Sequence, residues 1–216
     1  MEIQDLLERA IKETVNFPVL FAPFFVTAFL NATLGSDMLL SSMGPGWSIA
    51  LRVLIVLLLT PVASGMTIIL DRRIHSGQYP SLPDSLDGVL PYYLPLVAVN
   101  LVAWTGIILG FLLFLVPGIY LYVKFIFTTQ EVLLGRETDI TKALESSWNH
   151  TTNRWGTIFR IILIFEIPLL LISFTLGGLP PGWGATVSVI LTTVFQTLLT
   201  LVITHFYLGI VETEQV

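Results

Sequence analysis

The sequence predicts an all-α, polytopic membrane protein: six transmembrane helices in three hairpins, with short interfacial helices on the cytoplasmic side. First, 54% of the 216 residues are hydrophobic and 12% are charged, with a mean hydropathy of +0.84, whereas soluble domains carry roughly 25% charged residues. Second, several apolar runs reach the ~18 residues of a membrane-spanning helix. Third, Pro-Gly turns join these runs in pairs. Without a long polar stretch between them, residues 1–216 are expected to form a single membrane-embedded domain.

Two amphipathic segments complement the apolar ones. Residues 1–15 place apolar side chains at helical spacing opposite charged ones, which predicts a helix in the membrane interface or, alternatively, a solvated extension of the first span. Residues 139–149 predict a short interfacial helix, with Asp139 as its N-cap and Trp148 among lipid headgroups. The spans themselves are expected near residues 17–34, 48–70, 91–114, 118–134, 155–176 and 185–211.

The three turns suggest internal repetition. They lie at Pro45-Gly46, Pro117-Gly118 and Pro181-Gly182, and each precedes a returning apolar run. In the second turn, Pro117 suits the first turn of the helix that follows, because that position needs no backbone donor. Three related hairpins would produce this pattern. The preference of outer turns for proline, glycine and interfacial aromatic residues would produce it as well.

The basic residues predict the orientation. They occur before the first span and in the second and fourth loops, whereas the other three loops contain none. By the positive-inside rule, both termini and these basic loops are expected in the cytoplasm. The chain would then be a multi-pass protein of the cell membrane. The residues in question are Arg9, Lys12, Arg72, Arg73, Arg136, Lys142 and Arg154.

Several functions find no support in the sequence. A net charge of -5 with scattered basic residues argues against a nucleic-acid partner. The absence of cysteine excludes disulfides and thiolate ligands, and His75, His150 and His205 are isolated, so neither a metal nor a cofactor is expected. No hydrolase or nucleotide-binding motif is present, so an enzyme is not expected.

Ionisable residues within the predicted spans form a candidate polar network. Such a side chain costs several kcal/mol in hydrocarbon unless it is paired or solvated. We expect the fourth and fifth spans to pack side by side, with Lys124 reaching Glu166 or a polar group near it, and Glu131 reaching Arg160. Polar faces of the second, fourth and sixth spans would then meet in a permeation path, a lipid-headgroup pocket, or hydrogen bonds that hold the bundle together. The network comprises Arg52, Lys124, Glu131, Arg160, Glu166 and Gln196.

Three runs carry a resemblance to a known family: PGIYLYVKFIF at 117–127, ALESSW at 143–148 and NRWGTIF at 153–159. This region resembles the membrane domain attached to some glycerophosphodiester phosphodiesterases, and related stand-alone prokaryotic membrane proteins. The family's activity belongs to a separate soluble barrel with no counterpart in these 216 residues, so the resemblance implies no activity. The matching positions include Pro117, Gly118, Ser147, Trp148, Arg154 and Trp155.

Taken together, these features predict a membrane scaffold or accessory protein that presents cytoplasmic interfacial helices to lipid headgroups or to a membrane or cytoplasmic protein partner. The alternative is a transporter or lipid-handling protein that uses the polar interior. An intramembrane enzyme comes third, because no nucleophile and base can be paired.

Overall fold

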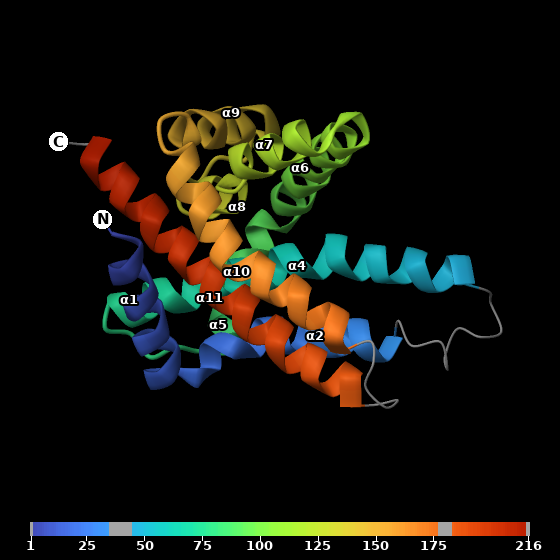
Figure 1. Ribbon diagram of the computed structural model, residues 1–216. Helices are drawn as coiled ribbons and strands as arrows, with labels where there is room; N and C mark the ends of the chain where they lie inside the picture. Colours follow the sequence, from blue (N-terminus) through green and yellow to red (C-terminus); the bar gives the residue numbers. More distant parts are fainter. Residues whose placement is uncertain (1, 35–44, 177–182, 215–216) are drawn as a thin grey trace.

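The computed structural model describes residues 2–34, 45–176 and 183–214, and the regular structure among them is helical (Figure 1). The all-α prediction is therefore confirmed. Among the residues described, four helical stretches are long and apolar enough to cross a membrane, or five if the bent pair at the N-terminal end counts as one span. The four are Ala50–His75, Leu82–Leu113, Trp155–Ile172 and Trp183–Glu214. The number of six spans stays a prediction.

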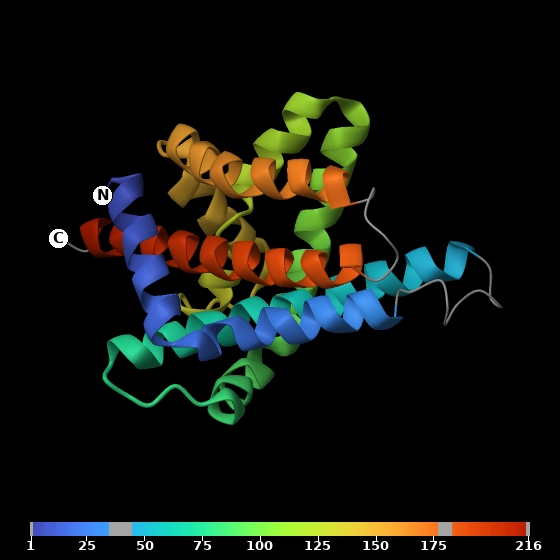
Figure 2. The same cartoon turned by 60° about the horizontal axis from the view of Figure 1, so that its bottom comes forward.

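Four helices pack together as the central layer, and Figure 2 shows them running roughly in one direction. Helix α11 contacts the other three directly. Helix α4 begins at Pro45, the position that tolerates a missing backbone donor best, whereas Pro181 and Gly182 lie outside the described residues. The helices are α2 (Ala22–Leu34), α4 (Pro45–His75), α10 (Trp155–Leu176) and α11 (Trp183–Glu214).

The N-terminal helix α1 (Ile3–Asn16) packs on α11. Leu6, Ala10 and Thr14 are spaced four residues apart, and this stripe is almost fully buried. The following η1 (Pro18–Phe21) starts a helical segment bent by 102° from α1, because proline disfavours a helical backbone in the residue before it. A helix therefore covers most of the predicted residues 1–15, with part of its apolar face covered by protein, and its place in a membrane interface stays a prediction.

A helical hairpin crosses the central layer (Figure 2). Its first arm, α6 (Tyr93–Leu113), follows α5 (Leu82–Val89) and η2 (Leu90–Tyr92), and its second arm is α7 (Leu115–Lys124). The chain reverses at Phe114, which has an extended backbone. The turn thus lies three residues before the predicted Pro117-Gly118, and Pro117 occupies the first turn of α7, as expected.

The prediction of one continuous span over residues 118–134 is wrong. Helix α7 ends at Lys124, residues 125–127 form a turn, and α8 covers only Thr128–Leu133. At ~1.5 Å per residue, α7 extends ~15 Å, about half of a bilayer core. The polar stripe expected along this span is consequently divided between two short helices.

A helix is found where the second interfacial helix was expected, as α9 (Ile140–Thr151), and its place in a membrane interface stays a prediction. Asp139 Oδ1 accepts hydrogen bonds from the amides of Thr141 at 2.9 Å and Lys142 at 3.1 Å, which caps the helix as expected. Its inner face contacts α6, α7 and α8. Trp148 is 36% exposed, so it is not buried with that face.

Candidate functional site

Lys124 ends α7 and is almost completely buried. Its Nζ donates to Thr152 Oγ1 at 2.9 Å and to the Trp148 carbonyl at 3.2 Å, and it lies 4.8 Å from the centre of the Trp148 ring. The carbonyls at the C-terminal end of α9 form the negative end of the helix dipole, which attracts an ammonium group. The predicted contact of Lys124 with Glu166 is therefore wrong.

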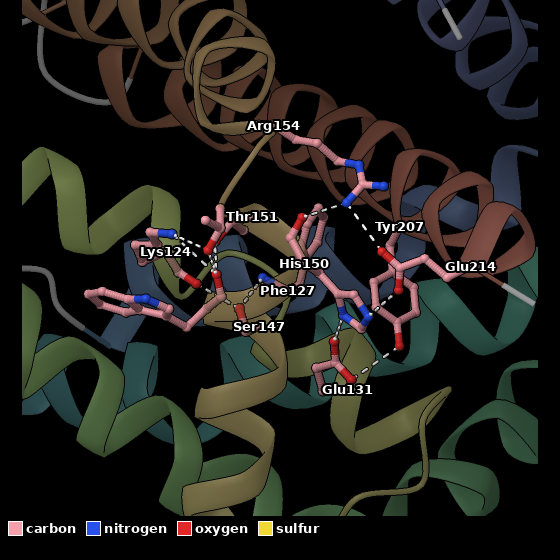
Figure 3. Close-up of polar contacts among 11 residues, drawn as sticks. Lys124, Phe127, Glu131, Ser147, His150, Thr151, Arg154, Tyr207 and Glu214 are labelled. Carbon is pink, nitrogen blue, oxygen red and sulfur yellow. Dashed lines mark hydrogen bonds and ion pairs between the residues drawn. The ribbon is translucent and has the colours of Figure 1, made fainter.

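Ser147 joins the two halves of the interrupted segment. Its hydroxyl donates to the Lys124 carbonyl at 2.8 Å and accepts from the Phe127 amide at 3.2 Å (Figure 3). Ser147 is fully buried, so these two backbone groups depend on it in the absence of a continuous helix. This contact gives the Ser-Trp pair of residues 147 and 148 a structural role that the sequence did not reveal.

Side chains of two helices contact the Glu131 carboxylate (Figure 3). His150 Nδ1 of α9 lies 2.6 Å from Glu131 Oε1, and the Tyr207 hydroxyl of α11 donates to Oε2 at 3.2 Å. His150 Nε2 also lies 3.1 Å from Glu214, which Arg154 approaches to 3.3 Å. Burial raises the pKa of the Glu131 carboxyl, and the His150 hydrogen bond acts in the opposite direction.

The predicted pair of Glu131 and Arg160 is also wrong. Arg160 is exposed, and its guanidinium contacts the Gly156 carbonyl and the Thr157 hydroxyl of its own helix. Arg52 is separate from both, because it lines a cavity of about 410 Å³ beside α2 and α6. The network expected from the sequence is thus distributed over several sites.

Glu166 and Gln196 do come together, at a larger cavity. This cavity of about 640 Å³ is bordered by α2, α4, α6, α7, α10 and α11 and is lined mainly by apolar side chains. The Tyr122 hydroxyl lies 3.5 Å from Glu166 Oε1, and Gln196 is hydrogen-bonded to the same carboxyl. Thr60 of α4 also lines it, so polar groups of the second, fourth and sixth predicted spans share one cavity.

Several other polar residues of the spans form hydrogen bonds within their own helix. Thr67, Thr193 and Thr204 donate to the carbonyls four residues earlier, at 2.7–2.9 Å. Thr204 in addition accepts from Gln130 Nε2 at 3.3 Å. These three hydroxyls are therefore satisfied within their own helices, and the Thr204–Gln130 bond joins two elements.

Four titratable residues from three helices converge at the end of the bundle near the termini. Glu13 comes from α1, Asp71 and His75 from α4, and His205 from α11, and their nearest ligand atoms all lie within 4.8 Å of one another. The sequence does not indicate this cluster, because residues so distant in the chain form no local motif. Only the spacing of Asp71 and His75, which places both on one helix face, could have pointed to it.

The aromatic residues of the family-like region pack around the buried lysine. The Trp155 ring stacks on Phe159 at a centroid distance of 4.9 Å and on Tyr120 at 6.3 Å, and Tyr120 meets the edge of Trp148 at 5.7 Å. Comparisons with protein-family models, curated proteins and solved structures gave no match. The resemblance to the phosphodiesterase-associated membrane domain therefore stays a prediction.

Proposed function

We propose that this chain is a lipid-handling protein of the cell membrane, which holds an amphipathic molecule in the cavity beside Glu166. The observation that carries the proposal is the composition of this 640 Å³ cavity: apolar walls from six helical elements, with one carboxyl group among them. Cavities of roughly 300–1,000 Å³ with few polar groups are typical of small-molecule sites. The apolar chain of such a ligand would lie against the apolar walls, and its polar group would contact Glu166.

The partners of Glu166 indicate the chemistry of that polar group. Tyr122 and Gln196 are neutral, and no cation pairs with Glu166 among the residues described here. A carboxylate within the membrane is stabilised by a cation or a hydrogen-bond donor. The ligand is therefore a long-chain molecule with an amine or another donor group. A fatty acid of equal length would be rejected, because its carboxylate would face Glu166.

The arrangement of the helices supports an orientation as well. The N-terminal end of α1 and the C-terminal end of α11 lie at the same end of the molecule, and α4 also ends there, with Arg72 and Arg73 in its last turn (Figure 1). We place this end in the cytoplasm, since basic residues favour that side. Helix α6 belongs to a stretch long enough to cross a membrane, but it runs across the direction of the central helices (Figure 2). In this orientation the α6–α7 hairpin enters the membrane without crossing it.

A photoactivatable long-chain amine and the fatty acid of the same length test ligand binding to the purified protein in detergent. Glu166→Gln should lower labelling by the amine about 10-fold, the loss expected for a hydrogen bond to a charged group. Ala28→Phe should also lower it, because Ala28 lines the cavity. Glu145→Gln and Ala50→Phe, at exposed positions, are the matched controls.

Equal labelling by the amine and the fatty acid, together with no effect of Ala28→Phe, would contradict the proposal. Labelling that falls equally in the cavity variants and in their controls would contradict it too, because the loss would then come from unfolding. Thermal unfolding of each variant separates these cases.

A scaffold function is the second candidate, and the exposed apolar side chains of α1 favour it. Ile11 is 50% exposed and Val15 is 74% exposed, so α1 offers apolar surface to a protein or lipid partner beyond the face buried on α11. This surface lies away from the Glu166 cavity. Both functions could therefore be served by one molecule, and the labelling experiment tests the lipid-handling function separately.

A further inference from the structure

The cluster of Glu13, Asp71, His75 and His205 has the composition of a metal site. Two imidazoles and two carboxylates are the donor set that Zn²⁺ and similar divalent ions bind with four ligands. Asp71 and His205 are almost fully buried, and the Glu13 side chain is 13% exposed. Two buried carboxylates beside each other call for positive charge between them.

The distances fit an ion better than direct hydrogen bonds. His205 Nε2 faces Glu13 Oε2 at 3.2 Å and Asp71 Oδ2 at 3.3 Å, and His75 Nε2 faces Glu13 Oε1 at 3.1 Å. Charge-assisted N–H···O bonds are usually about 2.7–2.9 Å long. Ligands bound tetrahedrally at ~2.1 Å from zinc are separated by about 3.4 Å. These three contacts are therefore spaced like ligands of one ion, and the ligand atoms of all four residues lie within 4.8 Å of one another.

Two details of the hydrogen bonding agree with a metal site. His75 Nδ1 lies 3.0 Å from the Asp71 carbonyl, and donation to this carbonyl leaves the lone pair of Nε2 directed at Glu13, the arrangement of a metal-binding histidine. Glu13 Oε2 is buried and has no hydrogen-bond partner among the described residues, although His205 Nε2 is 3.2 Å away. An ion between Glu13 Oε2 and His205 Nε2 would bind both atoms.

We propose that these four residues bind a divalent transition-metal ion, with zinc as the best fit, and that the ion fastens α1 to α4 and α11. Glu13 is the ligand contributed by α1, so the ion would add a bond between this helix and the bundle. His75 ends α4 and its side chain is 36% exposed, which gives the ion access from water. The site is separate from the Glu166 cavity, so it stands independently of the proposed function.

Zinc binding to the full-length protein tests the site directly. The protein is purified in detergent, stripped with EDTA and titrated with zinc against a competing chelator in excess magnesium, which prefers oxygen ligands. Wild type should bind about one ion per chain. His75→Gln should weaken binding roughly 100-fold, and Asp71→Asn should act likewise. His150→Gln is the control, because it removes the remaining histidine and leaves the cluster intact.

Trypsin reports the fastening of α1, because Arg9 and Lys12 are the basic residues of that helix. Zinc should slow cleavage at both in wild type and in His150→Gln, and should have no effect in His75→Gln. It should also raise the Tm of wild type by about 5 °C at saturation. Zinc binding that survives both His75→Gln and Asp71→Asn would overturn the site, and binding without protection of α1 would overturn the fastening.

Discussion

At the residue scale, Ser147 is the side chain on which the interruption of residues 125–127 depends. We expect Ser147→Ala to lower the free energy of unfolding by about 2 kcal/mol, because it leaves the Lys124 carbonyl and the Phe127 amide without their partner in the interior. Thermal unfolding of the purified protein in detergent measures this change. Ser146→Ala is the matched control, since Ser146 is only half-buried. An equal loss of unfolding free energy in the two variants would show that the interruption does not depend on the Ser147 hydroxyl.

The sequence identified several important polar residues but did not pair them correctly. The partners expected for Lys124 and Glu131 require one continuous helix, and the helix breaks between these two residues. Their actual partners lie on α9 and α11, at positions that no local pattern indicates. Glu166 and Gln196, both expected in the polar network, lie on the continuous helices α10 and α11 and share one cavity, although the sequence did not pair them.

At the element scale, the α6–α7 hairpin depends on a close approach of two glycines. A Cβ atom on Gly110 would lie 3.0 Å from the backbone of Gly118, so Gly110→Ala should force the helices apart. We expect a loss of about 1–2 kcal/mol, from overpacking partly offset by the better helix propensity of alanine. Gly156→Ala is the control, because a Cβ there meets nothing within 4 Å. Chemical unfolding in detergent that ranks the control as the less stable variant would contradict this account.

The elements differ in how well the sequence predicted them. The cap at Asp139 follows from local chemistry, and α9 begins where that residue predicts. The break after Lys124 has no glycine or proline to mark it. It follows from long-range contacts instead, with α9 supplying acceptors for Lys124 and a hydroxyl for the Phe127 amide. Interruptions of this kind are invisible to hydrophobic periodicity, because residues 119–134 remain mostly apolar.

At the scale of the whole molecule, the polar clusters and the Glu166 cavity occupy different depths. The clusters around Glu131 and His205 lie where α11 approaches its C-terminal end, whereas Gln196 lies nearer the middle of the same helix. In the orientation proposed above, the clusters would be near cytoplasmic water and the cavity within hydrocarbon. Glu13 and Glu214, from opposite ends of the chain, would then both bind histidines on the cytoplasmic side.

This orientation can be checked by cysteine labelling, because the chain contains no cysteine of its own. An impermeant maleimide applied from outside should label Ser41→Cys and Gly178→Cys, two predicted loop positions outside the described residues. It should label Ser76→Cys and Ser146→Cys only after permeabilisation. Val116→Cys distinguishes a membrane-inserted hairpin from six full spans. Val116 is 75% exposed at the tip of the hairpin, α7 extends only ~15 Å, and α6 runs across the direction of the central helices (Figure 2). The tip should therefore lie in hydrocarbon and react from neither side until the membrane is dissolved. A turn at the outer surface would instead make this cysteine as reactive from outside as the two loop positions, and that result would restore the six-span arrangement.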